Sequence, residues 1–283
     1  MHVALQEQIL TTVRVPDLVH PITAYPFNFI NALAGECVKF HIPVKSWELL
    51  HIPVYVMSIQ ISATIRQQLL SLEWFKSLSP DLAEEVIANG RVQMYKPNQW
   101  LYGEGDTETG IATVLCGSIN VWISIDGESS RLLSVGGPTT IIGQSRVLGG
   151  GDRLVTVTAR EESKVFTLGD SAIERIAAHH PELWRSMGEL LYKQLQNTVR
   201  ICALFALPSA QRIAHRLWEL HRTIGTNNDG TISVDQYELA DLSRVSRESL
   251  NAHLRKFEKN GWIVRGYKSI LITDLQTLQN FRE

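Results

Sequence analysis

The most informative stretch of the chain covers residues 237–262 and reads YELADLSRVSRESLNAHLRKFEKNGW. Leu239 and Leu242 have the spacing of the buried side of one short helix, and Val245 falls in the turn that follows. Ser246 is a favourable N-cap for a second helix. That helix has apolar residues at steps of four and three, which are Leu250, Leu254 and Phe257. The stretch therefore predicts two short helices joined by a tight turn.

The opposite face of the second helix is polar and largely cationic. It carries Arg247, Glu248, Asn251 and Arg255, with Lys256 and Lys259 further along. An arginine can bridge O6 and N7 of guanine, and a glutamate can accept a hydrogen bond from the N4 amine of cytosine. Residues at the start of such a helix face base edges, whereas the distal cations meet phosphates. The pattern predicts a DNA recognition helix.

A wing is predicted directly after this helix. Gly261 ends the helix, and residues 262–264 and 269–273 have the pattern of two strands around the loop 265–268. The formal net charge of the whole chain is only -2, yet cations outnumber acids between residues 244 and 268. A single charged helix face is usually just solvated. Helix, turn, capped basic helix and wing in succession favour DNA binding instead.

Residues 91–168 have a different texture, with short apolar runs separated by glycines. The runs are 100–102, 112–115, 119–125, 131–135, 140–142, 155–158 and 164–167. Many short strands at regular spacing are typical of an antiparallel roll or barrel. Ile119, Val121, Ile123 and Ile125 alternate along one run, as the buried face of a strand does.

The first 56 residues have prolines that interrupt every helical pattern, and helical spacing begins only after Met57. Two interpretations stay open. Either Met57 is the true start of translation, or residues 1–56 are a genuine accessory segment.

Helical periodicity returns after Asp170, with helices predicted over 171–178, 181–205 and 209–223. Pro208 separates the last two, because proline cannot continue a helix. Side chains at steps of four and three along the long helix are Met187, Leu191, Leu195, Thr198 and Cys202. A helix of roughly 25 residues spans about 37 Å, which is more than a small domain needs to cover its own core. We therefore predict a dimerisation helix with these residues at its seam, rather than a helix lying on the strands.

The remaining composition gives no sign of an extracellular, membrane or metal protein. Cys37, Cys116 and Cys202 are scattered without zinc or disulfide spacing, which favours a reducing cytoplasm. The sequence has no apolar run long enough for a membrane span and no signal-peptide pattern. We expect a cytoplasmic protein without a membrane or metal partner.

An enzyme is disfavoured by what the predicted barrel lacks. Metal-dependent barrel enzymes need clustered histidines, and the sequence has none between His51 and His179. It also contains no Walker loop, GxSxG elbow or HExxH helix. We therefore predict no catalytic residues.

In its order of parts the chain resembles the Crp/Fnr family, the bacterial regulators related to the cyclic-AMP receptor protein and the fumarate–nitrate reduction regulator. The resemblance covers roughly residues 72–271 and is carried by YKPNQWLYGEGD (95–106), VLCGSINV (114–121) and SRESLNAHLRKFEKNGWI (246–263). It implies an α+β fold: a cyclic-nucleotide-binding-type β-roll (jelly roll), a long dimerisation helix and a C-terminal winged helix-turn-helix. The domain bounds we expect are 1–56 for the uncertain extension, 57–180 for the β-roll sensor, 181–206 for the dimerisation helix and 207–283 for the DNA-binding domain.

The resemblance also implies a function. It predicts a homodimeric transcription regulator that binds an inverted repeat in double-stranded DNA and contacts RNA polymerase. In the family a polar loop before the DNA-binding helices can contact the polymerase, and the loop 226–230 is similar to it. Arg247 and Glu248 match the family's base-reading pair and Ser246 its phosphate contact, while Ala252 replaces a third base-reading residue. We assign DNA contacts to Ser246, Arg247, Glu248, Asn251, Arg255 and Lys268.

The sensor pocket implied by the resemblance departs from the pattern of cyclic-AMP binders. Gly143 and Arg153 are kept, but Gln144 replaces a glutamate that accepts ribose hydroxyls, and Leu154 replaces a small hydroxyl residue. Thr198 matches an adenine-contacting position. The alternatives are a cyclic nucleotide held in spite of these changes, a different anion on Arg153, or a structural role for Arg153. Two other functions also remain: a cyclic-nucleotide module regulating an attached protein, and a cupin-like barrel enzyme, which the missing histidines disfavour.

Overall fold

The computed structural model describes residues 57–282 apart from 107–109, 126–128 and 228. Residues 1–56, and with them both interpretations of the N-terminal segment, lie outside the described residues. None of the helices in the described part of the chain is both long enough and apolar enough to cross a membrane.

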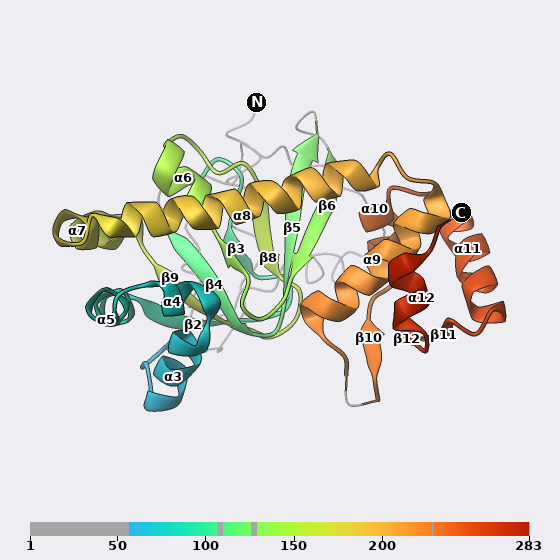
Figure 1. Ribbon diagram of the computed structural model, residues 1–283, viewed down its shortest axis with the longest axis horizontal. Coiled ribbons are helices and arrows are strands. Elements are labelled where there is room, and N and C mark those ends of the chain that lie inside the picture. The colour runs from blue at the N-terminus through green and yellow to red at the C-terminus, as the bar shows by residue number, and fades with distance from the viewer. Residues whose placement is uncertain (1–56, 107–109, 126–128, 228, 283) are drawn as a thin grey trace, which may run out of the picture. The chain divides into compact units, whose positions relative to one another are not determined.

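The β-roll consists of two antiparallel sheets, with strand orders β1-β2-β9-β4-β7 and β3-β8-β5-β6 (Figure 1). Its strands are β1 Met57–Ile59, β2 Arg91–Tyr95, β3 Trp100–Tyr102, β4 Ile111–Cys116, β5 Ile119–Ile125, β6 Ser129–Gly136, β7 Ile141–Ile142, β8 Thr156–Ala159 and β9 Ser163–Leu168. The predicted roll of short strands is confirmed. The sequence reading missed β1 and β2, which have no glycine-bounded apolar run.

Short helices pack against the roll and share its core. They are α3 Ala63–Ser71, α4 Glu73–Ser77, α5 Pro80–Asn89, α6 Gln144–Gly149 and α7 Asp170–His179. Ser79 caps α5 by accepting a hydrogen bond from the Leu82 amide, and Pro80 occupies the first turn, where its missing N–H costs nothing. Leu69, Leu82 and Ile173 are fully buried in this core.

The long helix α8 runs over Glu182–Leu204, beginning at α7 and ending before α9 (Figure 1). At 23 residues it spans roughly 35 Å. Leu183, Met187 and Leu190 belong to the core of the β-roll and its helices. The first third of α8 therefore packs on the β-roll of its own chain.

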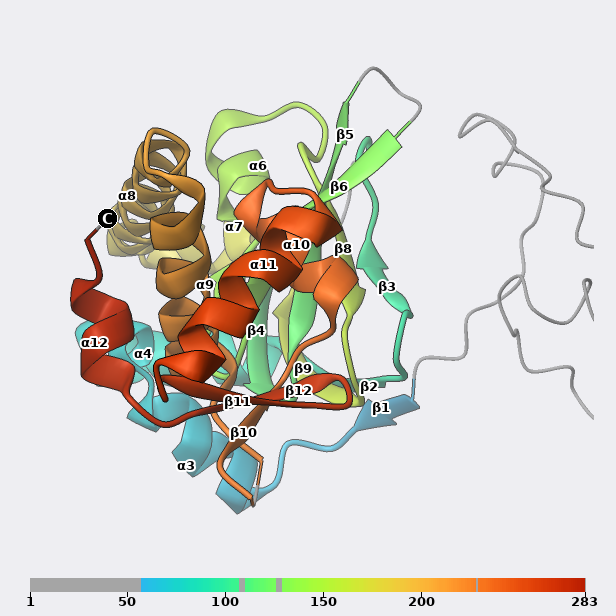
Figure 2. The same ribbon diagram turned by 90° about the vertical axis from the view of Figure 1, so that its right-hand side faces the viewer.

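The chain after α8 forms the winged domain. Its elements are α9 Ser209–Ile224, β10 Thr231–Ser233, α10 Gln236–Ser243, α11 Arg247–Lys259, β11 Ile263–Gly266, β12 Ser269–Ile272 and α12 Leu275–Asn280. The sheet has the order β10-β12-β11, and α10 and α11 lie on one side of it (Figure 2). The two helices and wing predicted from residues 237–273 are confirmed, while β10 and α12 were not foreseen.

The β5–β6 hairpin leaves the β-roll and enters the winged domain. Among the β5 side chains at 119–124, whose burial the structure describes, only Ile119 is fully buried, and Val121 and Ile123 are half-buried. The register shifts so that Val121 pairs with Ser134 and Trp122 with Leu132, which leaves an extra residue on β6. Leu132 is 1% exposed and packs in the core of the winged domain. Ile119 and Val121 pack with the core of the β-roll, as the predicted alternation requires, whereas Trp122 packs against the core of the winged domain.

Candidate nucleic-acid interface

The helix-turn-helix is fixed locally by two caps and one left-handed residue. Asp235 accepts a hydrogen bond from the Glu238 amide at 2.8 Å, which caps α10. Ser246 accepts one from the Ser249 amide at 3.2 Å, which caps α11. Between them Arg244 adopts the left-handed conformation, with φ 52° and ψ 52°. These features set the position of α11 against α10.

Arg212 of α9 ties this turn to the end of α8. Its guanidinium donates to the carbonyls of Ser243 at 2.9 Å, of Leu207 at 2.7 Å and of Arg244 at 3.3 Å. Carbonyls at a helix C-terminus have no partner within the helix, and Arg212 supplies one. The segment after α8 and the turn between α10 and α11 therefore share one cationic side chain, which sequence reasoning missed.

The recognition helix α11 buries one face and exposes the other. Leu250, Leu254 and Phe257 are at most 2% exposed. Ser246, Arg247, Glu248 and Arg255 are exposed, whereas Asn251 is half-buried and donates to the Gln236 side chain at 3.1 Å. The pKa of Glu248 lies below its usual range, because its own amide and the Ser246 hydroxyl donate to its carboxylate. Glu248 is thus ionised and can only accept hydrogen bonds.

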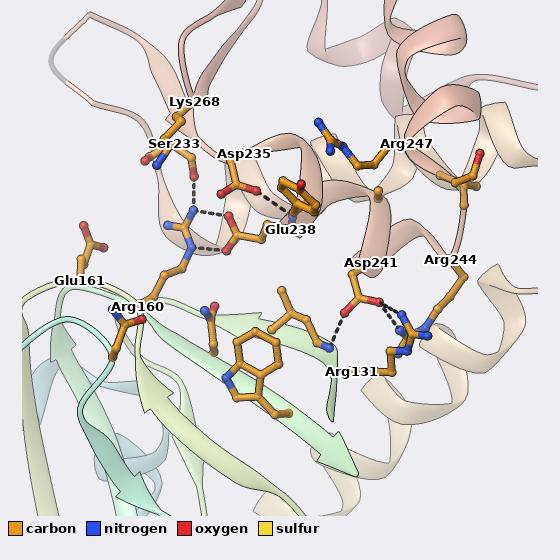
Figure 3. A pocket seen from close by; sticks show the side chains of 18 of the residues that line it. Arg131, Arg160, Glu161, Ser233, Asp235, Glu238, Asp241, Arg244, Arg247 and Lys268 are labelled. Carbon is orange, nitrogen blue, oxygen red and sulfur yellow. Dashed lines mark hydrogen bonds and ion pairs between the residues drawn. The ribbon is translucent and has the colours of Figure 1, made fainter. Parts of the chain in front are cut away.

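The wing places one lysine at its turn. Arg265 forms an ion pair with Glu258 at 2.7 Å, so both charges are engaged inside the winged domain. Lys268 lies at the turn with φ 51° and is exposed beside Tyr267. Of the DNA contacts assigned from sequence, Ser246, Arg247 and Lys268 line one groove of about 1240 Å³ (Figure 3).

The other wall of this groove belongs to the β-roll. Arg160, directly after β8, donates to the Glu238 carboxylate at 2.5 and 2.9 Å and to the Ser233 carbonyl (Figure 3). The Leu132 amide donates to Asp241 at 2.6 Å. Burial opposes the charge on Arg160, but its hydrogen bonds with Glu238 and the nearby carboxylates raise its pKa. The β-roll thus holds α10 through two carboxylates.

Of the effector residues predicted in the β-roll, Arg153 and Gly143 are in direct contact. Arg153 is 4% exposed. It donates to the Gly143 carbonyl at 2.6 Å and to the Gly110 carbonyl, and its guanidinium lies 4.4 Å from the centre of the Tyr102 ring. Burial lowers the pKa of Arg153 and raises that of Tyr102 to about 12. Gly143 has φ +100°, and a side chain there would collide with the Gly110 carbonyl.

Gln144 connects this region to α8. Its side chain is 1% exposed and donates to Gln194 of α8 at 2.8 Å, while its own Oε1 accepts no hydrogen bond from any described residue. Thr198 is exposed and donates to the Gln194 carbonyl at 3.0 Å. Leu154 is 71% exposed and therefore does not line a closed cavity. Gln194 was missed from sequence, because only the fold brings α6 against α8.

Comparison with known proteins supports both halves of this architecture. Residues 211–281 match the model of a Crp-like helix-turn-helix domain, and residues 92–180 match that of a cyclic nucleotide-binding domain. The chain belongs to the Crp/Fnr family of transcription regulators. This family consists of DNA-binding regulators and not of enzymes. The prediction that the protein is not an enzyme is therefore confirmed.

Similar proteins share the order of parts over most of their length. The Crp/Fnr regulator described here is 26% identical to the CRP-like cAMP-activated global transcriptional regulator of Mycobacterium tuberculosis, over 63% of this chain and 82% of the relative. It is 21% identical to the cyclic AMP receptor protein of Thermus thermophilus, over 72% and 94%. The structure of FixK2 from Bradyrhizobium japonicum has a TM-score of 0.59 at 16% identity, covering 68% and 96%, and shares the fold.

The long helix of this Crp/Fnr regulator differs from the predicted seam. Met187 is fully buried in the β-roll core, Leu191 is half-buried, and Thr198 is exposed beside an apolar stripe. That exposed stripe recurs at steps of three and four and consists of Tyr192, Leu195, Val199 and Cys202. Leu195 and Cys202 belong to both sets. Met187 packs in the core of its own chain, and Tyr192 and Val199 of the exposed stripe lie one position after the predicted Leu191 and Thr198.

Proposed function

We propose that this regulator binds an inverted-repeat operator as a homodimer through α11 and the wing, in the cytoplasm where bacterial DNA lies. The observation that carries the proposal is that Arg247 and Glu248 stand exposed at the N-terminus of a capped helix whose other face is completely buried. A rigidly held helix with a donor fork and an acceptor at its first turn suits base readout in the major groove.

The assigned residues divide into two roles. Arg247 would donate to guanine and Glu248 would accept from cytosine, with Asn251 one turn further along. Ser246, Arg255 and Lys268 would contact phosphates, which fix register without reading sequence. Their exposure supports this division.

A second copy of the chain is the partner we propose for α8. Beyond Leu191, most of the helix is exposed, including the apolar stripe Tyr192, Leu195, Val199 and Cys202. An exposed stripe at steps of three and four is the pattern of a two-stranded coiled coil. Two-fold pairing there would present two α11 helices to two half-sites about one turn of DNA apart.

We also propose that DNA binding does not depend on cyclic AMP. A phosphate would need the guanidinium of Arg153, which already donates to the Gly110 and Gly143 carbonyls. The donor end of Gln144 is bound to Gln194, which leaves only its buried Oε1 to accept from a ligand. These residues fit a cyclic nucleotide poorly, and the effector of the β-roll is a different ligand or none. We also propose that the loop 226–230 contacts RNA polymerase, and this proposal rests on the family resemblance.

The test is selection of bound sequences from a random duplex library, with and without cyclic AMP, at one stated salt concentration. We expect an inverted repeat in both conditions. An inverted repeat recovered only with cyclic AMP would refute the proposal that DNA binding does not depend on cyclic AMP. Loss of all enrichment in the wild type, or an Arg247→Ala variant with unchanged base preference, would refute base readout by α11.

A further inference from the structure

Two side chains in the first turn of α10 contact two of the α11 side chains that we assign to DNA, Arg247 and Asn251. The Arg247 guanidinium carbon lies 4.0 Å from the centre of the Tyr237 ring. Gln236 accepts the hydrogen bond from Asn251 at 3.1 Å. Arg247 and Asn251 are one helical turn apart and therefore share a face of α11. Each of these two side chains of α11 thus has its own support from α10.

Tyr237 has no role in the core that would explain its position. It is 67% exposed, while the residues of α10 that enter the core of the winged domain are Leu239, Ala240 and Leu242. A large aromatic ring left in solvent on a helix gains little from burial. The ring of Tyr237 instead contacts the guanidinium of Arg247.

The backbone that carries Tyr237 is held firmly. Asp235, two residues before Tyr237, caps the helix, and Glu238, the residue after Tyr237, is bound by Arg160 of the β-roll. An arginine side chain loses rotamer freedom when it binds, and a partner that holds it beforehand reduces that loss. A ring face near a guanidinium attracts it and leaves the N–H edges of the planar group available to a base.

We propose that Tyr237 is a positioning residue for base readout, which orients Arg247 toward the base edge it reads. Gln236 acts in the same way on Asn251. The inference rests on the proposed function, since it assigns Arg247 to a base. The ring itself reads no base, so its effect appears only through Arg247.

The experiment is a double-mutant cycle on the duplex that the wild type selects from a random library. Binding of wild type, Tyr237→Leu, Tyr237→Phe, Arg247→Ala and the Leu/Ala double variant is measured on that duplex and on duplexes with one base pair changed. We expect Tyr237→Leu to lose about two- to five-fold in affinity, which is the strength of an exposed cation–π contact. Tyr237→Phe keeps the ring face and should bind as the wild type does.

The loss should disappear wherever Arg247 no longer reads its base. Tyr237→Leu should therefore have no effect in the Arg247→Ala background. It should also have no effect on the duplex that is changed at the base pair read by Arg247, which is the change that leaves the affinity of Arg247→Ala unaltered. Binding to unrelated DNA and the melting temperature should stay unchanged.

The following outcomes would overturn the positioning role alone. They are wild-type affinity in Tyr237→Leu, an equal loss on every duplex and in both backgrounds, and an equal loss in Tyr237→Phe. A gain in affinity would show that the ring withholds Arg247 from DNA, and would also overturn it. If Arg247→Ala itself keeps the wild-type base preference, the proposed function fails first, and this inference falls with it.

Discussion

Arg160 and Glu238 form a two-point ion pair between the β-roll and the first helix of the helix-turn-helix. Their side chains are only 11% and 14% exposed, and their contacts are 2.5 and 2.9 Å. The two residues are 78 positions apart in the chain. Burying these two charges costs desolvation free energy. Only good contact geometry and a complete set of hydrogen-bond partners offset that cost.

Removal of one partner should therefore destabilise the protein. We expect Arg160→Met to lower the free energy of unfolding by about 3 kcal/mol, since Glu238 would keep a partly buried charge without its partner. The matched control is Arg66→Met, whose pair with Glu84 is half-exposed at 51% and 46% and should matter far less. Urea denaturation of both variants measures the difference, and equal losses would contradict this account.

Leu132→Ala should unfold the winged domain more easily, although Leu132 lies on a strand of the β-roll. The side chain is 1% exposed within the core of the winged domain. We expect a loss of about 2–5 kcal/mol from the cavity that remains. Amide exchange should increase in α9 and α10, whereas Leu154→Ala, at a residue 71% exposed, should change neither quantity. Faster exchange confined to the β-roll would argue against the shared core.

The turn after β6 contains a residue that is unsuited to its conformation. Thr139 has φ 75°, and the Thr140 amide donates to the Gly137 carbonyl, as in a type II turn. A β-branched residue is strained there, so Thr139→Gly should raise stability by about 0.5–1 kcal/mol. Gly137→Ala should do the opposite, because its added carbon would collide with the Thr223 carbonyl. Thermal melting of both variants checks the two signs.

Stability should decrease in mild acid through His215. Burial lowers the pKa of His215 below its ordinary value of 6.5, with Glu219 acting in the other direction and Arg216 and Arg282 adding to the decrease. The unfolded chain therefore binds a proton before the folded chain does, and stability falls as the pH drops below about 6.5. His215→Phe keeps a ring against Trp218 and should remove this part of the pH slope. An unchanged slope in that variant would assign the effect to other groups.

Charge on the exposed stripe of α8 should disrupt the proposed dimer. Leu195→Glu places like charges opposite each other across a two-fold axis, and we expect monomers in sedimentation equilibrium together with weaker operator binding. Asn197→Glu, on the far side of the helix, should stay dimeric. A dimeric Leu195→Glu variant would mean that two copies pair through a surface other than the exposed stripe of α8.

The sequence was most informative where the signal is local. The cap at Ser246, the stripe Leu250–Phe257 and the breaks at Gly261 and Pro208 act within a few residues, and the structure has the corresponding elements. The short strands were foreseen for the same reason, since turn residues bound each one. These local features are enough to predict the helices and strands without any long-range contact.

What the sequence did not reveal depends on contacts between distant segments. Nothing near Arg160 marks Glu238 as its partner, and the residue that fixes Gln144 comes from α8. The free face of α8 differed from the predicted seam because Met187 is used by the protomer's own core. The sequence led us to assign Arg153 to an effector pocket, which stays a prediction, and did not reveal its carbonyl partners, Gly110 and Gly143.

The place of Leu132 bears on how regulators of this kind exchange parts during evolution. A winged domain cut out after α8 would lose an apolar side chain that its own segment does not encode, and would fold with a hole in its centre. A chimera that joins this β-roll to a foreign winged domain would meet the reverse problem, an unmatched leucine beside the bulge in the middle of β6. Recombination between relatives should therefore succeed when the β5–β6 hairpin travels with the winged domain, so the inheritable unit is larger than the domain boundary suggests.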